Sequence, residues 1–229
     1  MTRIQIRVIS ALALIVLCIP VLAAQQDFAI PTLPSKSDLS STGTNPFFIL
    51  KPGYRLLLKS DTGELIITVL NETKMVDGVQ TRIVEERESD NGKLVEVSRN
   101  YFAISKKDNT VYYFGEDVDM YNSKGKITGH GGSWLAGVNG NKPGVMMPGA
   151  PKVGDRYYQE VAPKVAMDRF EILSLTETLK VPAGAMKNVL KTLETTPIEP
   201  GAKENKYYAR GIGLLKDGDM LLVEHGYAK

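Results

Sequence analysis

The sequence is poor in the residues that enzymes and metal proteins most often use. It has one cysteine, Cys18, and two histidines, His130 and His225. Because Cys18 is expected to leave with an N-terminal signal, the mature chain would hold no disulfide, no thiolate metal site and no cysteine nucleophile. Two distant histidines without an HExxH motif argue against zinc catalysis. We therefore predict no metal site and no cofactor.

Long hydrophobic runs are also lacking, except at the N-terminus. Arg3 and Arg7 precede an apolar run over residues 8–17, and the pattern ends at Ala23, where a signal peptidase could cut. The run is short for a membrane span of about 20 residues. We predict a signal peptide over residues 1–23, a periplasmic or secreted bacterial protein, and no integral membrane segment after cleavage.

An excess of charge of either sign is missing as well. Removing the signal peptide takes away Arg3 and Arg7 and leaves 26 basic and 26 acidic residues. The mature chain is then formally neutral, which argues against nucleic acid or an anionic membrane surface as the main partner.

Short apolar runs separated by turns fill most of the remaining chain. Asp77-Gly78 and Asp217-Gly218 are typical hairpin turns, and no segment has a long apolar stripe of helical period. Strands are predicted over residues 47–50, 54–58, 63–73, 81–88, 94–104, 111–121, 157–161, 169–181, 188–195, 206–210, 212–215 and 220–225. This pattern predicts an all-β fold with minor helix, in one antiparallel curved sheet that forms a half-barrel or open barrel.

Two segments depart from the strand pattern. Residues 24–45 are rich in serine and proline, and we predict a flexible linker there. The β domain follows over residues 46–229 and contains a Gly/Pro-rich loop at 122–154. Nine glycines and three prolines lie between Gly125 and Gly154, and a loop of this length in a compact domain is either functional or disordered.

Several short motifs lie between about residues 111 and 215. They are GEDVD at 115–119, GSWLAG at 132–137, KPG at 142–144, MP at 147–148, GD at 154–155, QE at 159–160, VPAG at 181–184, TTPIEPG at 195–201 and KYYA at 206–209. Together they resemble a family of uncharacterised exported bacterial proteins, and this resemblance implies export but no activity. A weaker likeness, in fold alone, is to the periplasmic lipoprotein-carrier half-barrels.

The Gly/Pro-rich loop carries the candidate binding residues. A flat aromatic ring and pliable thioethers beside glycines favour a pocket or a partner-docking surface. The candidate ligand-binding residues are Trp134, Met146, Met147, Tyr157 and His130. The alternative is a structural plug, in which Trp134 closes the open end of the sheet.

Carboxylates offer a second interpretation. The acidic residues near this region are Glu116, Asp117 and Asp119, and Asp155, Glu160, Asp168 and Glu171. The first group does not match a calcium loop, so a solvated strand end is favoured. On a strand, Asp117 and Asp119 share one face and Glu116 points to the other. The second group could supply a carboxylate pair for hydrolysis or ion pairs with Arg156 and Arg169.

Three functions therefore remain open. The first is a non-enzymatic binding module for an apolar small molecule, a lipid or a cell-envelope partner. The second is a carboxylate-dependent hydrolase whose catalytic residues are unknown, and the third is a structural envelope protein without a ligand. An apolar cavity beside Trp134 would favour the first, and an inward-facing carboxylate pair would favour the second.

Overall fold

The computed structural model describes residues 27–227, and the predicted signal peptide lies outside this range. The first half of the described chain forms a short 3-10 helix η1 (Lys36–Asp38) and strands β1 (Leu39–Ser40), β2 (Gly43–Asn45), β3 (Phe48–Leu50), β4 (Tyr54–Lys59), β5 (Gly63–Val76), β6 (Val79–Asp90), β7 (Lys93–Ser105) and β8 (Val111–Tyr121). The second half forms β9 (Ile127–Gly129), β10 (Trp134–Leu135), β11 (Lys142–Met147), β12 (Arg156–Tyr158), β13 (Glu160–Val161), β14 (Arg169–Val181), β15 (Gly184–Thr195), β16 (Lys203–Ala209), β17 (Gly213–Asp217) and β18 (Met220–Tyr227).

Tight turns let the long central strands pair as successive hairpins. Asp77-Gly78 joins β5 to β6 and Asn91-Gly92 joins β6 to β7, and all four residues have positive φ. Such backbone angles suit two-residue turns whose twist matches that of the flanking strands. The turn residues therefore set where each hairpin begins to pair, and irregularities between Val69 and Thr73 and between Glu88 and Ser89 then shift the register.

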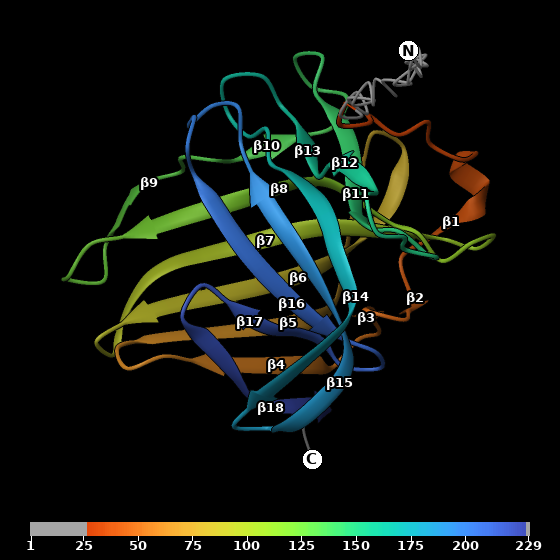
Figure 1. The fold of residues 1–229 in the computed structure, drawn as a ribbon. Helices are drawn as coiled ribbons and strands as arrows, with labels where there is room; N and C mark the ends of the chain where they lie inside the picture. Colours follow the sequence, from red (N-terminus) through yellow and green to blue (C-terminus); the bar gives the residue numbers. More distant parts are fainter. Residues whose placement is uncertain (1–26, 228–229) are drawn as a thin grey trace, which may run out of the picture.

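One antiparallel sheet wraps into a nearly closed barrel with a single open seam, which confirms the predicted fold class (Figure 1). The strand order is β12-β14-β15-β16-β17-β18-β4-β5-β6-β7-β8-β11-β13. The pairing of β18 with β4 joins the two halves of the chain. The two ends of this order, β12 and β13, are consecutive in sequence and are joined by Gln159 alone. The chain itself therefore crosses the seam.

One end of the barrel is filled with apolar side chains. The β2–β3 hairpin packs there, and the ring of Phe48 lies 5.1 Å from that of Phe102 on β7. Asn45 is fully buried, and its side-chain amide donates to the carbonyls of Asn109 and Pro148 at 2.9 Å each. These bonds satisfy a polar group that would otherwise be costly to bury, and they fix the hairpin against the barrel.

From Asp27 onward, the predicted linker packs on the barrel instead of standing apart from it. Ala29 exchanges backbone hydrogen bonds with β12, through Arg156 and Tyr158 at 3.0 Å. The Phe28 ring lies below the guanidinium of Arg169 at 4.3 Å. These anchors are irregularly spaced, so the segment has no periodicity that sequence analysis could detect.

The predicted loop over residues 122–154 also contains a barrel strand. Lys142–Met147 forms β11, which pairs with β8 on one side and with β13 on the other. Gly144 permits this close packing, because a Cβ atom there would lie 2.3 Å from the carbonyl oxygen of Tyr158. The glycine that suggested a loop is therefore required by a strand.

The part of the chain that the structure describes contains one 3-10 helix, η1, and otherwise strands and loops. Within residues 27–227, no helix is long and apolar enough to cross a membrane.

Candidate functional site

Away from the β2–β3 hairpin, the interior of the barrel becomes polar. Alternate residues of a strand share one face, so the side chains that point inward can be followed along a single strand from the apolar end to the polar end. Along β7 the inward series runs from Phe102 through Asn100 and Ser98 to Glu96, and along β16 from Tyr208 to Lys206. A cavity of about 230 Å³ lies at this polar end.

Carboxyl groups dominate the polar cavity. Those that line it are Glu86, Glu96, Glu116, Glu160, Asp168 and Glu194. The one cation among the lining residues is Lys206, which forms ion pairs with Glu194 at 3.3 Å and with Asp217 at 3.2 Å. If all of these groups were ionised, the cavity would carry a large negative charge, so it favours a cationic occupant.

Burial raises the pKa of each glutamate that lines the cavity. It raises the pKa of Glu116 to about 8 and that of Glu86 to about 7. Neighbouring carboxylates add to both shifts, and the charge of Lys206 opposes the shift of Glu86. Burial and the charge of Glu116 also raise the pKa of Glu160 well above its ordinary range. Burial opposes the charge of Lys206, but the attraction of Glu194 and Asp217 outweighs it and raises the pKa of that lysine. Low dielectric disfavours a carboxylate unless a cation faces it.

Hydrogen bonds order one side of this cavity. The hydroxyl of Tyr113 donates to Asn100, whose amide donates to Ser98 at 3.1 Å and to the carbonyl of Val84 at 3.3 Å. The amide of Gln159 donates to Glu194 at 3.2 Å. These hydrogen bonds therefore fix the positions of the side chains on this side of the cavity.

Two buried acceptors at the seam lack a hydrogen-bond partner within the described chain. They are Oε1 of Gln159 and Oε2 of Glu160, on side chains only 5% and 8% exposed. The indole N–H of Trp134 lies near the Glu160 carboxylate and opposes the rise in its pKa, but forms no hydrogen bond of standard geometry. Buried polar atoms without a hydrogen-bond partner are rare in folded proteins.

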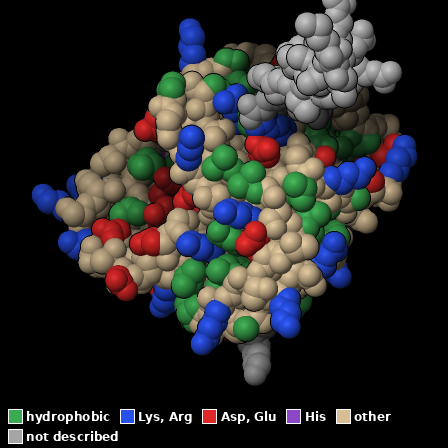
Figure 2. All heavy atoms as spheres, viewed as in Figure 1, with side chains coloured by type: hydrophobic (Ala, Val, Ile, Leu, Met, Phe, Trp, Pro, Cys, Tyr) green, Lys and Arg blue, Asp and Glu red, His purple; other side chains and the backbone are tan. Residues whose placement is uncertain are grey.

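An apolar cavity adjoins the polar one. Phe48, Ile49 and Leu56 are among its lining residues, and its volume is about 70 Å³. Both cavities are lined by Glu86, Met146 and Lys206, which mark their common boundary. In Figure 2, acidic side chains gather in a hollow at the left of the view, where the left-hand ends of β7 and β8 lie in Figure 1. The interior is therefore apolar at one end and acidic at the other.

The structure does not bring the five predicted binding residues together. Met146 lines both cavities, and Trp134 is buried against Tyr113 with ring centres 5.5 Å apart. Met147 is a core residue with 1% exposure, and Tyr157 packs on Phe170 at the seam. The side chain of His130 is 65% exposed. The burial of Trp134 fits the alternative in which it closes the sheet.

The predicted acidic groups divide between the two faces of the barrel. Glu116, Glu160 and Asp168 line the polar cavity. Asp155 accepts a hydrogen bond from the backbone of Lys152, and Glu171 pairs with Arg156 at 2.6 Å. Asp117 and Asp119 point away from the cavity. Within residues 27–227, no group of three acidic, histidine or cysteine side chains is placed to hold a metal ion.

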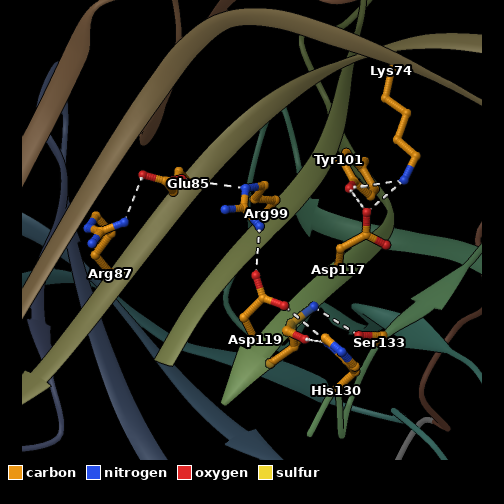
Figure 3. A network of polar contacts seen from close by, with 10 residues as sticks. Lys74, Glu85, Arg87, Arg99, Tyr101, Asp117, Asp119, His130 and Ser133 are labelled. Atoms are coloured by element: carbon orange, nitrogen blue, oxygen red, sulfur yellow. Dashed lines mark hydrogen bonds and ion pairs between the residues drawn. The ribbon is translucent and has the colours of Figure 1, made fainter. Parts of the chain in front are cut away.

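Asp117 and Asp119 belong to an ionic network on the outer face of β7 and β8 (Figure 3). Asp117 pairs with Lys74 at 2.8 Å and accepts a hydrogen bond from Tyr101. Asp119 pairs with Arg99 at 3.1 Å and contacts Nδ1 of His130 at 3.0 Å. All of these carboxylates have cationic or hydroxyl partners, so this face needs no ligand to satisfy them.

Sequence reasoning missed Glu86, Glu96, Glu194 and Lys206 as members of the site. Part of the signal is present as alternation: Glu96, Ser98 and Asn100 are polar residues at every second position of one strand. Such alternation normally marks the solvent face of a half-buried sheet. Comparisons with known proteins give no further candidate for the site: no protein-family model, curated protein or solved structure matches this chain.

Proposed function

We propose that this protein is a non-enzymatic binding module that holds a small amphiphilic molecule inside its barrel. The observation that carries the proposal is the pair of adjoining cavities, one apolar and one acidic, that share Glu86, Met146 and Lys206. The apolar part of a ligand would lie beside Phe48 and Ile49, and its polar group would reach the carboxylates. Sites of this kind combine apolar walls with a few polar groups that fix orientation.

Export remains part of this proposal. The support for it is the order of charged, apolar and small residues up to Ala23. A binding module outside the cytoplasm would take its ligand from the envelope or the surrounding medium.

The proposal is tested by filling the apolar cavity. Ile67 lines it, whereas Ile66 points to the other face of β5. Isothermal titration calorimetry would measure the binding of eight-carbon amphiphiles to Ile67→Trp and to the matched control Ile66→Trp. We expect Ile67→Trp to lose binding and the control to retain it. Equal affinity in both variants would contradict binding inside the barrel.

A carboxylate-dependent hydrolase is the second candidate. It is favoured by the pKa of Glu116, raised to about 8 by burial, because a general acid must be protonated near neutral pH. Native mass spectrometry of protein purified from its own host distinguishes the two. A binding module would carry an intact ligand in stoichiometric amount, and a hydrolase would turn it over.

A further inference from the structure

We propose that the acidic end of the interior recognises an organic ammonium group, held between Glu116, Glu160 and Gln159. This inference rests on the proposed function and names the chemistry of the ligand's polar end. The ligand would be an amphiphilic amine, with an apolar chain directed toward the β2–β3 hairpin.

The charge balance of the cavity is the first argument. Within residues 27–227, no Lys, Arg or His side chain forms an ion pair with Glu116 or Glu160. Lys206 is already shared between Glu194 and Asp217. A cation supplied by the ligand would neutralise the remaining carboxylates, whereas a ligand carboxylate would be repelled by them.

The unpartnered acceptors are the second argument. Oε1 of Gln159 and Oε2 of Glu160 are buried and accept no hydrogen bond of standard geometry, although the indole N–H of Trp134 lies near Glu160, and both residues line the cavity. An ammonium group has three N–H donors and no acceptor. It would supply the hydrogen bonds that these two oxygens lack, and they would orient it in turn.

The wide spacing of the carboxylates favours an amine over a bare metal ion as the bound cation. Hard cations need several oxygens converging on one point at about 2.0–2.6 Å. The described residues contain no such converging group. An ammonium bridges acceptors through hydrogen bonds of about 2.8 Å, so it suits carboxylates that stand farther apart around a cavity.

Amine binding would also release protons. The groups that face Glu116 are Glu86 on β6, Glu96 on β7, Tyr113 on β8, Glu160 on β13 and Asp168. Burial raises the pKa of Glu116 to about 8 and that of Glu86 to about 7, so part of this cluster is protonated at pH 7. A bound cation stabilises the ionised forms, and affinity should therefore rise between pH 6 and about pH 8.

The experiment compares three ligands that share one chain, namely octylamine, octanol and octanoate, each used below its micelle concentration. Calorimetry on the unmodified protein at pH 8 should give octylamine an affinity at least about tenfold higher than octanol, with octanoate weakest. Titrations in two buffers of different ionisation enthalpy should show proton release with octylamine. Octanol or octanoate binding as tightly as octylamine would overturn this inference but leave the binding module intact. If none of the three binds, both proposals fail.

Substitutions of the cavity carboxylates test where the ammonium group binds. Glu116→Gln and Glu160→Gln should each lower the affinity for octylamine about tenfold and leave the affinity for octanol unchanged. Glu224→Gln, at an exposed position on β18, is the matched control and should change the affinity for neither ligand. Circular dichroism confirms that each variant is folded. Unchanged octylamine affinity in both folded cavity variants would place the ammonium elsewhere and overturn the assignment.

Discussion

Glu116 shows how one position in a strand decides the chemistry of a side chain. It faces the interior of the barrel, where burial raises its pKa to about 8. The next residue, Asp117, faces outward, where contacts with Lys74 and Tyr101 lower its pKa despite partial burial. A shift of one residue along β8 therefore separates a carboxyl group that prefers to be neutral from one that prefers to be charged.

We expect stability to depend on pH through Glu116. Its folded pKa of about 8 lies above its ordinary value of 4.5, so its contribution is fully present below pH 4.5 and is lost as pH rises toward 8. Glu116→Gln should remove this decline, making the variant more stable than the original protein by about 1–2 kcal/mol at pH 8.5, after discounting for solvent in the cavity. Urea unfolding at pH 5, 7 and 8.5 measures the difference. The same pH dependence in both proteins would show that Glu116 is not desolvated.

At the scale of elements, regular strands were predictable and irregular ones were not. The predicted strands 111–121 and 169–181 coincide with β8 and β14, because turns with Asn, Asp and Gly mark their ends. β11 was missed because Gly144 and Pro143 are usually loop residues. The acidic interior was missed for another reason: Glu86 and Glu96 lie on a strand face that points to solvent in an open sheet and inward in a closed barrel.

Gly144 should be the least replaceable residue of β11. A Cβ atom there would lie 2.3 Å from backbone atoms of Tyr158 and Gln159, and the backbone cannot move aside as a flexible side chain would. We expect Gly144→Ala to reduce the free energy of unfolding by about 1–3 kcal/mol. Gly129→Ala on β9, where a Cβ would meet nothing within 4 Å, is the matched control. Chemical denaturation that finds the two variants equally stable would mean that β11 does not approach the seam this closely.

At the scale of the whole molecule, we predict that the protein works outside the cytoplasm. The described residues form a barrel that needs no disulfide, in keeping with a chain whose single cysteine, Cys18, precedes the predicted cleavage point. We expect N-terminal sequencing of the protein from its own host to begin after Ala23. A mature chain that begins at Met1 and fractionates with the cytosol would contradict export.

A single residue joins the two edges of the sheet across the seam. Because Gln159 links β12 directly to β13, the two sheet edges are fastened together by covalent bonds. One residue spans only about 3.5 Å even when fully extended, so the ends of β12 and β13 stay close together at this point of the seam. The β2–β3 hairpin covers the apolar end. On the proposed binding function, a ligand that enters through the acidic end would meet the cavity's carboxylates before it reaches the apolar cavity.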